Sequence, residues 1–197
     1  MNLSVNSSPE IARQQVVQAH HCQTLIHLFD DTFFKTHQTR LVKGDDEPVY
    51  LPANHQVGYH RIIFAHGFFA SALHEIAHWC VAGKARRLLE DFGYWYCPDG
   101  RDHQQQQAFE SVEIKPQALE WCFSVAAGFP FQASIDNLSG GPSDRLAFQQ
   151  RILAQVQTYL RDGLPERADI FVAALRSTYN TPKLQATQFF WQNDRID

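Results

Sequence analysis

The sequence predicts an α+β fold, with one domain spanning residues 1–197. Three observations lead to this prediction. Apolar residues recur at helical spacing in several long segments, a compact β-branched run at 61–65 is typical of a strand, and a polar turn at 44–48 separates two short extended runs. Apolar residues make up 44% of the chain and charged residues 19%, an ordinary globular balance in a chain long enough to bury a core.

The first third of the chain predicts a helix followed by strands. The helix is expected to begin at Pro9 and to continue to about Asp31 on an apolar stripe. Residues 41–42 and 49–51 flank the polar turn and predict a short hairpin. Together with the run at 61–65, they predict a small mixed or antiparallel sheet.

Helices dominate the remainder. Ser71 is placed to cap a helix that ends near Gly83, and the aromatic run 91–96 suits a strand. Residues 108–128 are helical in pattern, and Pro116 marks either a kink or the first turn of a second helix. The last segments are predicted as a loop at 129–141, helices at 142–162 and 165–179, and an aromatic tail at 189–191.

Composition excludes several classes of protein. A net charge of −4 argues against a general nucleic-acid binder, which would carry a basic face. The first ten positions are mostly polar, so they do not predict a signal peptide, and no apolar run approaches the length of a membrane span. The four cysteines form no C-x-x-C pair, which favours reduced thiols. We therefore expect a cytoplasmic protein without nucleic-acid or membrane partners.

The most informative motif is His74-Glu75-Ile76-Ala77-His78, an H-E-x-x-H pattern. On a helix, residues four apart share one face, so the two imidazoles can bind one metal ion. Glu75 is then placed to act on the species in the open metal position, which makes it the candidate catalytic residue. With ten histidines in the chain a chance pair is the alternative, but the apolar residues between them suit a half-buried helix and favour the metal site.

A strand, a turn and a metal-binding helix in this order are typical of a compact zincin-like core, the fold of many metallopeptidases. A catalytic metal needs a third protein ligand, and no H-x-x-G-x-x-H follows the motif. Glu110, Glu113 and Glu120 all lie on the later helical segment, where a glutamate ligand is expected. Glu113 is preferred because small and amide residues follow it at 116–118. Glu110 is the runner-up and could instead orient a histidine, whereas Glu120 is expected to be an ordinary helix carboxylate.

Weaker signals concern substrate binding. Tyr94 and Tyr96 are core residues by default, but an outward ring could hold an alkyl-ammonium group. Arg101 is either a solvated surface residue or a contact to an acidic partner. Asp136 is by default a turn residue and otherwise a contact to a substrate ammonium group. His66 ends the strand at 61–65 and is either structural or a lining residue of the cleft.

Longer strings are more specific than H-E-x-x-H. They are H-E-I-A-H-W-C at 74–80, D-F-G-Y-W-Y-C-P-D-G-R at 91–101, V-E-I-K-P-Q-A-L-E-W at 112–121 and S-I-D-N-L at 134–138. In these strings the chain resembles the bacterial elongation factor P hydroxylase family. The strings span about positions 60 to 140, and the resemblance extends over most of the chain.

The resemblance implies a protein-lysine hydroxylase, an oxidoreductase that modifies the β-lysylated lysine of translation elongation factor P. It implies Fe(II), with zinc possible, and molecular oxygen as co-substrate, because oxygen insertion into a C–H bond needs a metal that changes oxidation state. His74, His78 and Glu113 would then be the ligands, and Glu75 would manage protons. The motif alone leaves two alternatives, a small zinc metallopeptidase and a binding module with a structural metal.

Overall fold

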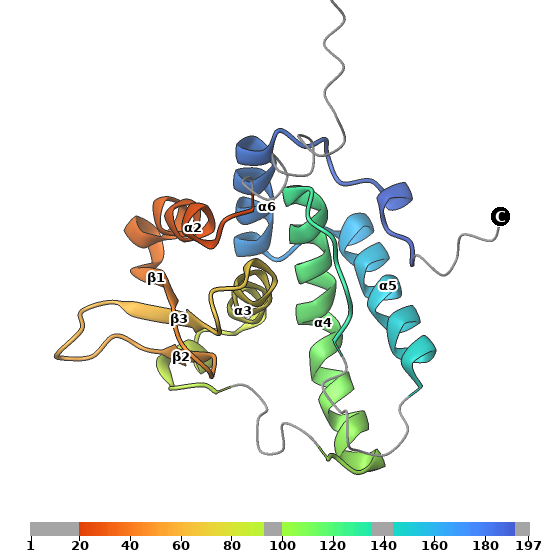
Figure 1. Cartoon of the computed structure of the whole chain (residues 1–197), viewed down its shortest axis with the longest axis horizontal. Coiled ribbons are helices and arrows are strands. Elements are labelled where there is room, and N and C mark those ends of the chain that lie inside the picture. Colours follow the sequence, from red (N-terminus) through yellow and green to blue (C-terminus); the bar gives the residue numbers. More distant parts are fainter. Residues whose placement is uncertain (1–19, 93–99, 135–143, 192–197) are drawn as a thin grey trace, which may run out of the picture.

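The computed structural model describes residues 20–92, 100–134 and 144–191. In these ranges five α-helices accompany a three-stranded mixed sheet, which confirms the predicted α+β class (Figure 1). The elements are α2 (Cys22–His37), β1 (Thr39–Lys43), β2 (Val49–Leu51), β3 (His60–Phe64), α3 (Phe69–Val81), η1 (Arg86–Leu88), α4 (His103–Ala127), α5 (Arg145–Asp162), α6 (Glu166–Tyr179) and η2 (Ala186–Gln188).

The sheet has the strand order β1-β3-β2, with β1 parallel and β2 antiparallel to β3. The predicted hairpin between β1 and β2 is therefore wrong, because β3 lies between them. Gly44, just after β1, donates its N–H to the Phe64 carbonyl at 2.9 Å, and a Cβ at Gly44 would lie 2.5 Å from the Ile63 side chain. The chain thus crosses closely over the end of β3 instead of turning back on β1.

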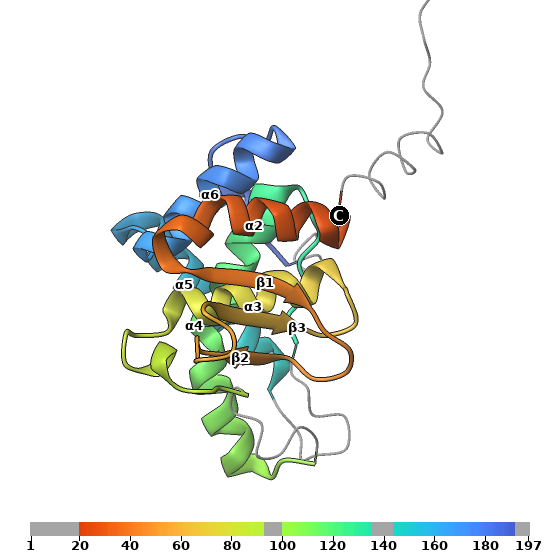
Figure 2. The same cartoon turned by 90° about the vertical axis from the view of Figure 1, so that its left-hand side faces the viewer.

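The helices are layered on one face of this sheet. Helix α3 lies between the sheet and α4, and α5 lies on the far side of α4, as Figures 1 and 2 show from two directions. Helices α2 and α6 pack beside α3 and close the core. The largest fully buried side chains are Phe29, Phe33, Phe64, Phe123, Phe148 and Phe171. Burial of these rings supplies the main apolar contribution to folding.

Helix α3 begins earlier than predicted. Its first residue is Phe69 and its N-cap is Phe68, whose side chain makes no capping hydrogen bond. The prediction that Ser71 caps this helix is wrong, because Ser71 lies inside the first turn. The helix ends at Val81, two residues before Gly83.

Helix α4 is a single helix that runs through Pro116 without starting again. It also begins five residues before the predicted Ala108. Asp102 and Gln105 form a capping box at its start, so the glutamine-rich segment belongs to the helix. Gly128 ends it with a positive φ of 65°, where a residue without a Cβ is favoured.

Other predictions are borne out in part. Helix α2 continues past Asp31 to His37, while the predicted part from Pro9 to residue 19 lies outside the described residues. Of the predicted strand 91–96, the structure describes the first two residues, and Asp91 forms an isolated bridge with Tyr50. Helices α5 and α6 are present, with starts at Arg145 and Glu166.

The end of the described chain is held by aromatic packing, as predicted. Phe189 is buried, and its ring lies 5.5 Å from that of Trp121. Trp191 packs at 4.4 Å on the same indole. None of the described helices has the length and apolar character needed to cross a membrane. Cys22, Cys80 and Cys122 carry free thiols, as predicted, and Cys97 lies outside the described residues.

Candidate metal centre

Helix α3 presents the two motif histidines side by side. Ile76 and Ala77 are fully buried, which fixes the rotation of the helix and keeps His74 and His78 together on its other side. The two Nε2 atoms are 3.0 Å apart. The four-residue spacing therefore brings both imidazoles to one point, as predicted.

Helix α4 brings a carboxylate to the same point. Glu113 Oε1 lies 3.2 Å from Nε2 of His78, and its Oε2 lies 3.7 Å from Nε2 of His74. The Glu113 side chain is almost completely buried. One donor atom from each of the three residues lies within 4.8 Å of the others, so the group could hold a metal ion.

The donor set suits a divalent transition metal. Ligand atoms about 2.1 Å from one ion lie about 3.0–3.4 Å apart at octahedral to tetrahedral angles, close to the separations seen here. Two imidazoles and one carboxylate are the ligands of many mononuclear non-haem iron sites and of some zinc sites. The three residues therefore fit such an ion without rearrangement of the backbone.

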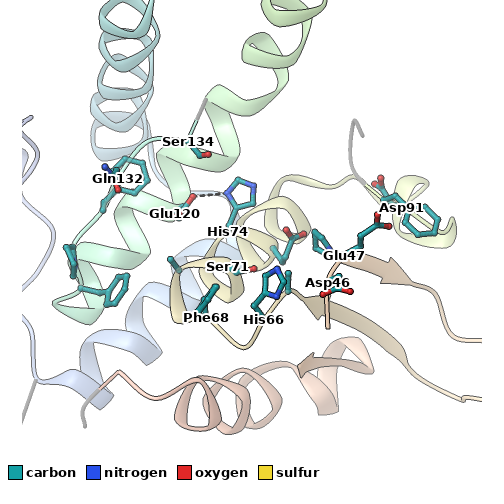
Figure 3. Close-up of a pocket in the computed structure, with 18 of the residues that line it drawn as sticks. Asp46, Glu47, His66, Phe68, Ser71, His74, Asp91, Glu120, Gln132 and Ser134 are labelled. Carbon is teal, nitrogen blue, oxygen red and sulfur yellow. Dashed lines mark hydrogen bonds and ion pairs between the residues drawn. The ribbon is translucent and has the colours of Figure 1, made fainter. Parts of the chain in front are cut away.

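A second glutamate orients the first histidine. Glu120 Oε2 lies 2.8 Å from Nδ1 of His74, so Nδ1 donates its proton to this carboxylate and Nε2 is left to face the other ligands (Figure 3). The prediction that Glu120 is an ordinary helix carboxylate is wrong. Its seven-residue spacing from Glu113, about two helical turns, was the signal that could have placed both on one face.

Glu110, the runner-up ligand, is directed elsewhere. Its carboxylate accepts hydrogen bonds from Arg151 on α5 and, at 3.2 Å, from Gln106. The structure thus places Glu113 rather than Glu110 beside the two histidines, and Glu120 takes the orienting position considered for Glu110.

Gln117 is a further residue that the sequence did not single out for a role. Its Nε2 lies 3.4 Å from Glu113 Oε2 and donates at 2.8 Å to the carbonyl of Ser134. Its Oε1 accepts the Ser134 N–H at 3.1 Å. This buried amide therefore ties Glu113 to the segment that follows α4.

The pKa values of His74 and Glu113 are both shifted from their ordinary values. Burial lowers the pKa of His74, but the hydrogen bond and charge of Glu120, with the charges of Glu113 and Glu75, outweigh it and raise the pKa to about 10. Burial raises the pKa of Glu113, but the charge and hydrogen bond of His78 and the charge of His74 lower it to about 2. Without a metal, a protonated His74 is therefore paired with the carboxylates of Glu120 and Glu113.

Glu75 stands apart from the ligand candidates. Burial raises its pKa, as do the charges of Glu113 and Glu120, whereas His74 and His78 lower it. The residue lines two cavities, a large one that His74 also lines and a small one of about 40 Å³ bounded by Tyr50 and His78. A carboxyl group with a raised pKa beside a metal centre is suited to proton transfer.

A cavity of about 1230 Å³ opens over the centre, with His74, Glu75 and Glu120 in its wall. Figure 3 shows Asp46 and Glu47 on the same side of it as His66, and Gln132 and Ser134 on the opposite side. Its other acidic lining residues are Glu90 and Asp91, and Asp91 is paired with Arg86. No lysine or arginine is among the lining residues within the described ranges, so the cavity favours a cationic ligand.

Of the four residues predicted to bind substrate, the structure describes Arg101. Tyr94, Tyr96 and Asp136 lie outside the described residues. Arg101 is buried, its Nε donates to Gln106, and its guanidinium lies 3.9 Å from the centre of the Phe109 ring. It does not line the large cavity.

Fold and site together define an α+β protein with a candidate two-histidine, one-carboxylate metal centre beside an acidic cavity, with His74 in the cavity wall. The profile of the elongation factor P hydroxylase family matches residues 28–189, and the chain belongs to this family. A relative from Haemophilus influenzae, named elongation factor P lysine hydroxylase, is 56% identical over 162 residues. The match covers 82% of this chain and 91% of the relative. The family resemblance read from the sequence is thus confirmed.

Proposed function

We propose that this protein hydroxylates the β-lysylated lysine of elongation factor P in the cytoplasm, as a single metal-dependent domain. The observation that carries the proposal is the convergence of His74, His78 and Glu113 beside an acidic cavity whose wall includes His74, in a member of the elongation factor P hydroxylase family. A lysine extended by a β-lysyl group is long and bears two amines. A cavity of about 1230 Å³ bordered by carboxylates suits such a side chain.

His74, His78 and Glu113 would hold the ion, Fe(II) in the active enzyme, although zinc could occupy the same donors. When bound, Fe(II) supplies the one-electron chemistry that activates molecular oxygen for insertion into a C–H bond, which zinc cannot do. One oxygen atom enters the lysine side chain and the other leaves as water, so a two-electron donor also takes part.

The surrounding side chains orient the candidate ligands and supply a group for proton transfer. With an ion bound, Glu120 would accept the Nδ1 proton of His74 and leave Nε2 unprotonated as the ligand atom. Gln117 fixes Glu113 through its bonds to Ser134. Glu75, beside the centre and in contact with the cavity, is the residue we propose as proton donor and acceptor during oxygen reduction.

We further propose that the core is zincin-like. Its order of strand β3, turn and motif helix α3, with a glutamate on the following long helix, is the order of the metallopeptidase core. Neither comparison names a peptidase, so the peptidase alternative gains no support from them. A metallopeptidase-like scaffold used for oxidation accounts for both the motif and the family.

The reaction is tested by the mass of elongation factor P. β-Lysylated factor incubated with the iron-loaded protein, oxygen and a reductant should gain the mass of one oxygen atom on its modified lysine. Glu113→Gln should abolish this gain, while Glu110→Gln, a matched change three residues away, should retain it. No mass gain with the unaltered protein, under conditions in which it holds iron, would reject the proposed function.

A further inference from the structure

The segment that joins β3 to α3 lies at the edge of the large cavity and contains two residues of types that are unusual at their backbone positions. His66 and Phe68, two residues of this segment, both line that cavity (Figure 3). His66 has a positive φ, which glycine adopts more readily, and Phe68 is a helix N-cap, where a short polar residue is preferred. Such departures are a reason to look for a functional constraint.

His66 has a left-handed backbone, with a φ of 56°. Among the described residues the other non-glycine positions with positive φ are Gln38 and Asn180, and both are helix C-caps, where this conformation is ordinary. His66 caps no helix. Its N–H donates to the Asp45 carbonyl at 2.7 Å, which holds the strained backbone in place. No helix end therefore accounts for the conformation of His66.

Gly67 maintains the unusual turn. Its φ is 71°, and a Cβ at this position would lie 2.7 Å from the side chain of Lys43. Lys43 packs beside this glycine but does not line the cavity. The double left-handed turn at 66–67 thus directs the following residue, Phe68, to the cavity edge.

Phe68 is the N-cap of α3, a position where Ser, Thr, Asp or Asn would satisfy a free backbone N–H. Its side chain makes no capping hydrogen bond and is 64% exposed. The rings of His66 and Phe68 are 5.6 Å apart. Within the described part of the chain, the His66 imidazole has no hydrogen-bond partner. Neither side chain thus contributes to the core.

We propose that His66 and Phe68 form a subsite that holds the cationic aliphatic side chain of the substrate at the cavity mouth. The proposal rests on the proposed function and names residues that give it specificity. The two rings offer faces for ammonium and methylene groups, and the carboxylates of Asp46 and Glu47 border the same side of the cavity. The β-lysyl extension adds both kinds of group, so the subsite distinguishes modified from unmodified lysine.

Two substitutions separate this role from a structural one. His66→Gly removes the ring and relieves the left-handed strain, and Phe68→Ser removes the other ring and introduces a capping hydroxyl. Both variants should unfold at a Tm equal to or above that of the unaltered protein. Matched controls are His55→Gly and Leu146→Ser, which remove an exposed imidazole and an exposed apolar side chain outside the cavity.

The measurement is the Kd for β-lysylated and for unmodified elongation factor P, by calorimetry on the full-length protein. We expect each subsite variant to weaken binding of the modified factor by about fivefold, the size of one exposed cation–π contact, and to leave binding of the unmodified factor unchanged. The controls should bind both forms like the unaltered protein. The proposal would be overturned if both subsite variants preferred the modified factor as strongly as the unaltered protein does. It would also be overturned if a lowered Tm accounted for their weaker binding.

Binding and turnover separate the two hypotheses. If the unaltered protein prefers the modified factor and the two variants lose that preference, but the unaltered protein adds no oxygen, the proposed reaction fails while the subsite stands. If it hydroxylates the factor and the two variants keep its Kd, the subsite fails while the reaction stands.

Discussion

At the scale of single residues, one hydrogen bond determines how the centre can bind a metal. The carboxylate of Glu120 accepts the Nδ1 proton of His74, so the imidazole has one nitrogen committed and the other directed at Glu113 and His78. A carboxylate in this position also increases the basicity of the ring. The local motif H-E-x-x-H predicts the two histidines, but it carries no information about a partner 46 positions away.

Replacing Glu120 tests this role. Glu120→Gln keeps the shape of the side chain but removes the charge, and we expect metal affinity to fall by about 10–100-fold. Activity should return at high metal concentration, because the three ligands remain. Titration of the metal-free protein with Fe(II) under anaerobic conditions measures the change. Unaltered affinity would show that the contact only packs the two helices together.

The charge of Glu113 predicts a pH dependence of stability in the metal-free protein. Its pKa in the folded state is about 2, below the ordinary 4.5. A lowered pKa stabilises the folded protein above the ordinary value, and this contribution, about 3 kcal/mol, is lost as the pH falls from 4.5 towards 2. Urea unfolding should therefore show a steeper loss of stability in acid for the unaltered protein than for Glu113→Gln. Parallel curves would contradict the prediction.

At the scale of elements, the site depends on the position of α3 between the sheet and α4. The end of α3 is held by Arg167 on α6, whose Nη2 donates to the carbonyls of Trp79 at 2.8 Å, Cys80 at 3.0 Å and Ala82 at 2.7 Å. These carbonyls belong to the last turn and C-cap of α3, immediately after His78, where helix carbonyls lack partners within the helix. A cation there also complements the helix dipole.

Arg167→Ala should therefore loosen the last turn of α3. We expect a loss of about 2 kcal/mol in the free energy of unfolding and a weaker metal affinity, because His78 lies in that turn. Arg176→Ala is a suitable control, since Arg176 lies on the same helix and donates to the Pro182 carbonyl instead. Denaturant unfolding and metal titration of both variants provide the comparison, and equal metal affinity in the two would refute the link to His78.

The sequence predicts an element correctly where the signals that define it are local. Helices α5 and α6 were predictable because their apolar spacing and end signals are local. The strand pairing was not predictable, because local turn signals cannot reveal that β3 lies between β1 and β2. The cap at Ser71 failed because the chain instead places Phe68 at the N-cap, against the usual preference.

At the scale of the molecule, the sheet, α3 and α4 form successive layers (Figure 1). The candidate ligands come from both helices, His74 and His78 from α3 and Glu113 from α4. The α+β class followed from composition and periodicity, and Glu113 followed from its place after the motif. The cavity, its acidic wall and the hydrogen bonds of Gln117 to Ser134 could not be predicted, because they arise from segments far apart in the sequence. An ion held by α3 and α4 together would stabilise the folded protein as a whole.

The central claim is that His74, His78 and Glu113 together bind one ion. The most direct test is the Fe(II) content of anaerobically prepared protein, measured with the Tm before and after chelation. We predict one Fe(II) per chain and a Tm that falls on chelation for the unaltered protein and for Glu110→Gln, and neither property for Glu113→Gln. Iron binding that survives in Glu113→Gln, or is lost in Glu110→Gln, would contradict the account.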